Sequence, residues 1–199
     1  MLGLLVLMAA GCANQPAPVN ETAAVEAVQK LGGRLTVDEK QPGKPVIGVD
    51  LGNTEVTDAG LKELKAIQSL QSLSLSNTKV TDAGLKEVKE LQNLVELYLG
   101  HTKVTDAGLN ELKEIKTLQA LHIHDTKITD AGLKELREIN TLQWLDLNET
   151  QVTDAGLNEL SGLMNLQVLN VQGTQVTAAG LKKLQAALPK LQTLPQILR

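Results

Sequence analysis

Hydrophobic residues follow two alternating spacings along most of this chain. Leu73 and Leu75 alternate with serines, and alternation with a period of two predicts a strand that buries one face. A few residues later Leu85, Val88 and Leu91 are spaced by three, which predicts the apolar stripe of a short helix. The same order of strand, turn and helix returns six times. The chain is therefore predicted to consist of repeated units.

A five-residue word, TDAGL, marks each unit. Because its Thr-Asp pair offers short oxygen-bearing side chains to the free N–H groups of a first helical turn, it predicts the start of the helix. A unit of this size cannot bury its own apolar stripe, so each unit must stack on a neighbour. The word recurs every 24 residues and returns as TAAGL in the last unit; it starts at Thr57, Thr81, Thr105, Thr129, Thr153 and Thr177.

The full repeat reads L-x-x-L-x-L-x-x-T-x-V/I-T-D-A-G-L-x-x-L-x-x-I/L, and it resembles the leucine-rich repeats. Within that family it is similar to the subtype with an I-T-D-x-G-L core, which usually has cysteine at the end of the strand segment. Since a buried hydroxyl needs a partner, we predict a ladder of threonine hydroxyls hydrogen-bonded to the turn backbone in place of the thiols. The threonines are Thr54, Thr78, Thr102, Thr126, Thr150 and Thr174.

The resemblance implies an α/β fold, a right-handed leucine-rich-repeat solenoid. Six parallel strands are expected on its concave face and six short helices on its convex face. Because a ladder core is open at both ends, we expect caps there: a helix over residues 22–31 and a strand over 34–39 at the first end, and a short strand broken by Pro195 at the other. The predicted parts are residues 21–45 (N-terminal cap), 46–190 (six repeats of 24–25 residues) and 191–199 (C-terminal cap).

The N-terminus has a different character. Residues 2–10 form an apolar run that is too short to cross a bilayer, which needs about 20 residues, but has the size of a signal-peptide core. The ending Gly11-Cys12 resembles the bacterial lipobox, which implies lipidation of Cys12 and an exported, membrane-anchored lipoprotein of the bacterial cell envelope. Residues 1–11 are then the signal peptide and 12–20 a tether. No Lys or Arg precedes the apolar run, and the alternative is an ordinary apolar terminus with a buried free cysteine.

Composition and charge limit the classes of binding partner that we expect. The net charge is −4, and both signs are interspersed along the predicted helices, which is typical of a solvated convex surface. Since no basic stripe is available to neutralise phosphates, we expect no nucleic-acid partner. Cys12 is the single cysteine, so no disulfide can form within the chain. We expect a monomer without cofactor.

Two repeated columns could carry chemistry. The aspartates of TDAGL could bind calcium as a stacked row, but we favour a structural role in the first helical turn, where the helix dipole stabilises a carboxylate by about 0.3–1 kcal/mol. The glycines of the same word are predicted to let the helix approach the strand closely. The aspartates are Asp58, Asp82, Asp106, Asp130 and Asp154, and the glycines are Gly60, Gly84, Gly108, Gly132, Gly156 and Gly180.

The positions that differ between repeats lie between the leucines of each strand and face the concave side. The single tyrosine, the single tryptophan and two of the three histidines fall there, in three consecutive repeats. Large amphipathic side chains on a surface of Ser, Gly and Asn are typical of a binding hot spot, whereas the alternative is drift at unconstrained positions. The predicted binding residues are Tyr98, His122, His124, Trp144 and Asp146.

These observations predict a membrane-tethered module that binds a protein or another macromolecule through the concave patch. An alternative is a structural lipoprotein of the cell envelope without a dedicated ligand. His122, His124 and Asp146 are also suitable metal ligands, and His122 with Asp146 could form an acid/base pair. An open sheet face offers neither enclosure nor a nearby nucleophile, so we expect no enzyme and no metal site.

Overall fold

The computed structural model describes residues 19–194. The predicted signal peptide, Cys12 and most of the tether therefore lie outside the described residues, as does the end of the predicted C-terminal cap. Helix α1 begins at Val19, inside the segment that the sequence predicts as tether, and ends at Lys30. Gly32, with a backbone φ of +79°, follows it, as is common where a helix ends.

Eight strands form one sheet in the described part of the chain, and their order in the sheet is their order in the sequence. The first pair is antiparallel, and the other neighbours are parallel and in register at the same position of successive repeats. The strands are β1 (Arg34–Val37), β2 (Val46–Asp50), β3 (Ser72–Ser74), β4 (Glu96–Tyr98), β5 (Ala120–His122), β6 (Trp144–Asp146), β7 (Val168–Asn170) and β8 (Gln192–Thr193).

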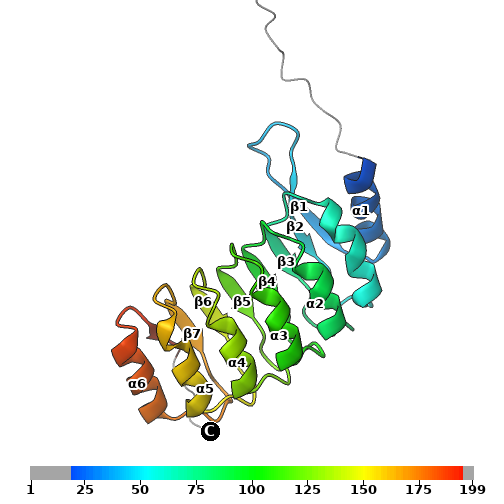
Figure 1. Ribbon diagram of the computed structural model, residues 1–199. Coiled ribbons are helices and arrows are strands. Elements are labelled where there is room, and N and C mark those ends of the chain that lie inside the picture. Colours follow the sequence, from blue (N-terminus) through cyan, green and yellow to red (C-terminus); the bar gives the residue numbers. More distant parts are fainter. Residues whose placement is uncertain (1–18, 195–199) are drawn as a thin grey trace, which may run out of the picture.

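Short helices connect the parallel strands and form a second layer along one side of the sheet (Figure 1). From β2 onwards strands and helical segments alternate, which confirms the predicted leucine-rich-repeat solenoid. The first repeat differs in that its helical segment has 3-10 geometry. The segments are η1 (Asp58–Ala66), α2 (Asp82–Val88), α3 (Asp106–Leu112), α4 (Asp130–Leu136), α5 (Asp154–Glu159) extended by η2 (Leu160–Gly162), and α6 (Ala178–Ala187).

The TDAGL threonine starts the helices as predicted. In α2 the Thr81 hydroxyl accepts a hydrogen bond from the N–H of Ala83 at 3.2 Å, and the same bond recurs at the start of α3, α4 and α5. Thr57 makes no such bond, and the segment that follows it is the 3-10 helix η1. The hydroxyl thus satisfies a first-turn donor in the regular repeats.

Between the two layers lies a continuous ladder of leucine, isoleucine and valine. The central strand leucines Leu73, Leu97, Leu121, Leu145 and Leu169 have no exposed surface. Each is aligned in the sheet with the equivalent leucine of the neighbouring repeat, and all belong to one buried cluster, so the repeats share a single core. This shared burial orients the alternate strand residues outward, where the variable positions lie.

The threonine column closes the turn after each strand. The Thr78 hydroxyl donates to the carbonyl of Leu75 at 2.6 Å, and the equivalent bond is present in the other five repeats. This confirms the predicted ladder of hydroxyls bonded to turn backbone. The residue before each of these threonines has a positive φ, as with His101 at 56° and Asp125 at 47°, so the turn is tight and its side chains stand at the rim of the sheet.

The TDAGL aspartates have a role that the helix-dipole interpretation missed. In five repeats the carboxylate accepts hydrogen bonds from both the N–H and the hydroxyl of the threonine that starts the next helix. Each aspartate therefore ties its repeat to the following one. Ala178 takes this place in α6, the last repeat helix.

In the second to sixth repeats the TDAGL glycine makes room for the carboxylate of the preceding repeat rather than for the strand alone, whereas Gly60 in the first repeat faces Val56 and Leu31. A Cβ atom on Gly132 would lie 2.3 Å from the Asp106 Oδ1 atom, and one on Gly180 would lie 2.1 Å from the Asp154 Oδ1 atom. Any side chain here would displace the aspartate of the preceding repeat. The word TDAGL thus encodes both partners of one contact between repeats.

Candidate functional site

The strand register places the predicted binding residues, which belong to neighbouring repeats, side by side on the concave face. Tyr98 of β4 pairs with His122 of β5, which pairs with Asp146 of β6. On the same two strands, Trp144 pairs with Ala120, two residues before the pair of His122 and Asp146. Because the leucines between these positions point into the core, the side chains project together from the outer side of the sheet.

Three rings form an aromatic cluster on this face: Tyr98, His122 and Trp144. The Tyr98 and His122 rings are stacked, with centroids 4.4 Å apart and an angle of 10° between their planes. The His122 and Trp144 rings are tilted by 31°, with centroids 5.9 Å apart. His122 is thus the central member. Trp144 stays 36% exposed, one of two large hydrophobic residues in the described chain with so much free surface.

His124 lies beside this cluster in a space that Gly100 provides. A Cβ atom on Gly100 would lie 2.2 Å from the Cε1 atom of His124, so any side chain there would displace the imidazole. The Nδ1 atom of His124 is buried without a hydrogen bond, 3.6 Å from the Oδ2 atom of Asp146. Burial lowers the pKa of His124 below its ordinary value, although the Asp146 charge acts in the opposite direction.

Asp146 lies between the two histidines, with its Oδ2 atom 3.8 Å from the His122 Nδ1 atom. Burial alone would raise the pKa of the Asp146 carboxyl. The His122 imidazole, the N–H of Asn148 and the nearby His124 outweigh this effect, and the pKa is held below its ordinary value. The site therefore contains a partly buried carboxylate that stays charged at neutral pH.

The rim of the sheet extends the cluster by two residues. The Nδ1 atom of His101 lies 2.5 Å from the Oδ2 atom of Asp125, across neighbouring repeats. The His101 ring also meets the His124 ring edge-on, with centroids 5.0 Å apart. All three histidines of the chain are therefore within one connected group.

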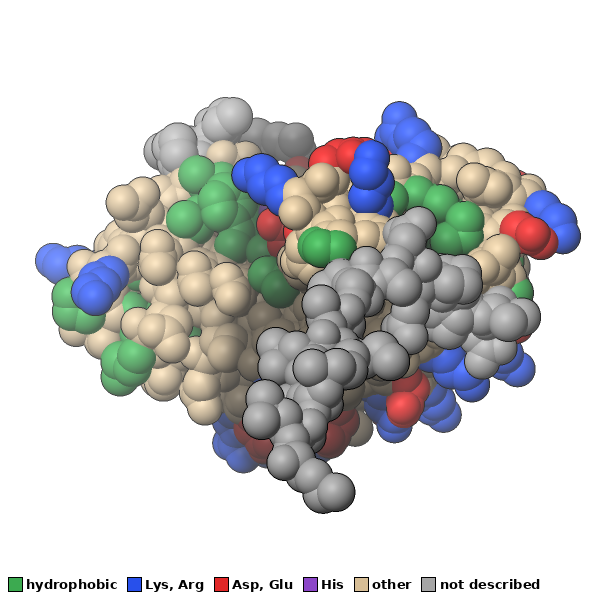
Figure 2. Space-filling model, turned by 90° about the horizontal axis from the view of Figure 1, so that it is seen from above, with side chains coloured by type: hydrophobic (Ala, Val, Ile, Leu, Met, Phe, Trp, Pro, Cys, Tyr) green, Lys and Arg blue, Asp and Glu red, His purple; other side chains and the backbone are tan. Residues whose placement is uncertain are grey.

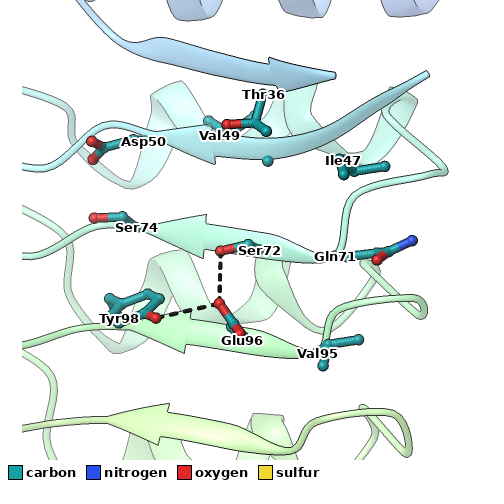
Figure 3. Close-up of a pocket in the computed structure, with 11 residues that line it drawn as sticks. Thr36, Ile47, Val49, Asp50, Gln71, Ser72, Ser74, Val95, Glu96 and Tyr98 are labelled. Atoms are coloured by element: carbon teal, nitrogen blue, oxygen red, sulfur yellow. Dashed lines mark hydrogen bonds between the residues drawn. The ribbon is translucent and has the colours of Figure 1, made fainter. Parts of the chain in front are cut away.

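A hollow lies next to the aromatic cluster, towards the N-terminal end of the sheet (Figure 3). Its volume is about 440 Å³, and β2, β3 and β4 line it together with Thr36 of β1. Tyr98 forms one wall. This hollow was not among the features predicted from the sequence, although small residues at the concave positions of β2 and β3 followed by Tyr98 are its sequence signal.

Two carboxylates line the hollow, with different partners. Asp50 pairs with the exposed Arg34, whose Nη2 atom is 2.6 Å from the Asp50 Oδ2 atom. Burial acts to raise the pKa of Asp50, but Arg34 and the N–H of Gly52 lower it overall. The Oε2 atom of Glu96 instead accepts from the hydroxyls of Ser72 and Tyr98, each at 3.3 Å (Figure 3). Burial and the Glu96 carboxylate raise the pKa of the Tyr98 hydroxyl.

No three His, Cys, Asp or Glu side chains within residues 19–194 are arranged to hold a metal ion. In the view of Figure 2, Lys and Arg side chains are spread around the outline of the molecule with Asp and Glu side chains between them. None of the helices in this part of the chain is both long enough and apolar enough to cross a membrane.

Comparisons with known proteins agree with the repeat architecture. The family described as "Leucine Rich repeats (2 copies)" matches residues 68–114, and the family "Leucine Rich repeat" matches residues 115–136 and 162–184. The chain is a leucine-rich repeat protein. No curated protein matches it in sequence.

Solved structures of similar fold include two internalins from Listeria monocytogenes. An internalin designated InlF is 24% identical, with a TM-score of 0.60 over 73% of this chain and 39% of its own. Internalin C2 is 21% identical, with a TM-score of 0.54 over 90% of this chain and 87% of its own. The chain thus spans about two fifths of the first internalin's length. At these identities the likeness concerns the fold.

Proposed function

We propose that this protein is a membrane-tethered binding module that recognises a partner protein through its concave face and acts as a monomer. Leucine-rich repeats generally bind proteins, and a solenoid of this kind presents an extended surface for that purpose. The binding residues are Tyr98, His122, His124, Trp144 and Asp146.

The stacked aromatic cluster is the observation that carries this proposal. Tyr98, His122 and Trp144 belong to three repeats, yet their rings pack against one another and Trp144 remains 36% exposed. The solenoid core does not require them, because the leucines beneath them fill the interior. Rigid amphipathic rings lose little conformational entropy on binding and are enriched where interfaces gain most of their energy.

Replacing Tyr98, His122 and Trp144 together by alanine tests the proposal. The variant should retain the thermal unfolding transition of the parent chain but no longer capture the partner from envelope extracts. A matched control replaces three exposed lysines on the convex face, Lys86, Lys134 and Lys182. Saturable capture should persist in the control. Equal capture by both triple variants would refute the concave site.

The membrane tether is a separate part of the proposal. It rests on the apolar run at residues 2–10 followed by Cys12, and it has a test of its own. Cys12→Ser should move the protein from the membrane fraction to the soluble fraction. An unchanged membrane fraction would remove the lipoprotein interpretation without affecting the concave site.

A further inference from the structure

We propose that the hollow beside Tyr98 binds the guanidinium group of an arginine side chain presented by the partner protein. This inference rests on the proposed function, since it names the chemistry by which part of the same concave face would recognise its partner. It is carried by three features of the hollow: its shape, its charge and its aromatic wall.

The shape follows from a change in side-chain size along one row of the sheet. Ser74 precedes Tyr98 in register, and His122 follows it. Because His122 covers one face of the Tyr98 ring, the other face is directed towards the short Ser74 side chain. The space that Ser74 leaves unfilled, continued towards β2, is the hollow of about 440 Å³. It is large enough for the end of a long side chain.

The charge comes from Glu96. This carboxylate is half-buried and accepts hydrogen bonds from the hydroxyls of Ser72 and Tyr98. The residues that line the hollow include no Lys or Arg. Arg34 at the edge is already paired with Asp50. Within residues 19–194 the Glu96 carboxylate therefore has no cationic partner, in surroundings where an ion pair is less screened than at an open surface.

The aromatic wall distinguishes arginine from lysine. A planar guanidinium can stack on the free face of the Tyr98 ring while its N–H groups donate to the Glu96 carboxylate, whereas an ammonium is a compact and strongly hydrated charge. The methylene groups of the arginine would lie along the apolar surface of Ile47 and Val95, which also line the hollow. One side chain thereby satisfies all three features.

Binding of short blocked peptides to the 199-residue chain tests the inference directly. The probes are acetyl-Gly-Arg-Gly-amide, the same peptide with lysine, and the same peptide with citrulline, which has the shape of arginine but no charge. Tyr98 is the single tyrosine of the chain, so its ring signals in an NMR spectrum report on the hollow without ambiguity. We expect saturable shifts with the arginine peptide, weaker binding of the lysine peptide and no saturable shift with citrulline.

Glu96→Gln provides the decisive variant, because glutamine keeps an oxygen acceptor for Ser72 and Tyr98 but removes the charge. The arginine peptide should bind at least about fivefold more weakly, as expected for loss of a charge-assisted hydrogen bond. Glu138→Gln, an exposed substitution near the end of α4, should leave binding unchanged. Equal binding by Glu96→Gln and the parent chain would overturn the inference, as would lysine or citrulline peptides that bind as tightly as arginine.

A single variant separates this inference from the proposed function. Trp144→Ala leaves Glu96, Tyr98 and the His122 ring stacked on Tyr98 in place, so it should bind the arginine peptide while losing capture of the partner. If the variant loses capture of the partner and the parent chain does not bind the arginine peptide, the hollow is refuted as an arginine site while the concave binding site stands. Glu96→Gln should also weaken capture of the partner. Unchanged capture would show that the hollow takes no part in recognition and would overturn the inference.

Discussion

The carboxylate of Asp82 accepts two hydrogen bonds from Thr105 of the next repeat, from its N–H and from its hydroxyl, both at 2.7 Å. These two hydrogen bonds join the first turns of successive helices, α2 and α3, so they stabilise the stacking of repeats rather than either repeat alone. Because the stability of a solenoid depends on the interfaces between neighbours, this contact acts where the fold is most sensitive.

Removing one such carboxylate from the middle of the ladder should destabilise the whole chain. We expect Asp106→Ala to lower the free energy of unfolding by about 1–2 kcal/mol, because two donors of Thr129 lose a charged acceptor. Urea unfolding followed by circular dichroism measures the loss. Glu63→Ala, an exposed change on η1, is the control. An equal effect of both variants would contradict the stabilising role of the Asp–Thr contact between repeats.

The glycine opposite this carboxylate should be coupled to it energetically. Gly132→Ala places a Cβ atom 2.3 Å from the Asp106 Oδ1 atom, and we expect a cost of about 1–3 kcal/mol from the displaced carboxylate. In the Asp106→Ala background the same change should cost at least about 1 kcal/mol less, because the clash is gone and alanine favours a helix. A double-mutant cycle measures the coupling. Additive effects would refute the interpretation of the glycine column.

Low pH should weaken the contact between Asp154 and Thr177, the last of the Asp–Thr contacts between repeats. The hydroxyl and the N–H of Thr177 hold the pKa of Asp154 below its ordinary value of 3.8. A depressed carboxyl pKa contributes stability that is fully present above the unfolded value and is lost as the pH falls through the folded value. Asp154→Asn should therefore lose less stability than the parent chain when the pH is lowered below 3.8. Thermal unfolding at a series of pH values tests this, and parallel curves would contradict it.

The partly buried imidazole of His124 should have a pKa below that of an ordinary histidine. Burial lowers the pKa of His124, so its NMR titration midpoint should lie below 6.5. Asp146→Asn should lower that midpoint further, because the carboxylate stabilises the protonated ring. Gly100→Ala provides a second probe, since it displaces the imidazole from its space. A midpoint at or above 6.5 in the parent chain would contradict the burial of this histidine.

The threonine ladder offers a matched pair of substitutions in one position. Thr126→Val removes the hydroxyl that donates to the Ile123 carbonyl at 2.6 Å and should cost about 1 kcal/mol of unfolding free energy, whereas Thr126→Ser keeps the donor. Chemical unfolding of the two variants measures how much the hydroxyl and the methyl group each contribute to the free energy of unfolding. A valine variant as stable as the parent chain would show that the bond contributes nothing.

The repeat architecture follows from the order of residues alone. A strict 24-residue period, strand alternation at Leu73 and Leu75 and helical spacing at Leu85 and Val88 predict stacked repeats, because those spacings reflect local backbone geometry and the need to bury one face. The threonine hydroxyl ladder and the helix starts are also local, since their bonds reach only two or three residues along the chain. Local rules were sufficient for these features.

The roles of the repeated Asp and Gly and the contacts between the variable residues depend on the packing of one repeat against the next. Asp106 contacts Thr129 and Gly132, 23 and 26 residues further on, and no periodicity shows which oxygen faces which donor. The concave cluster was predicted as a set of residues, but the stacking of Tyr98 on His122 depends on rotamers set by neighbours in other repeats. The hollow beside Tyr98 exists for the same reason: an empty space is defined by the side chains around it, and these come from four strands.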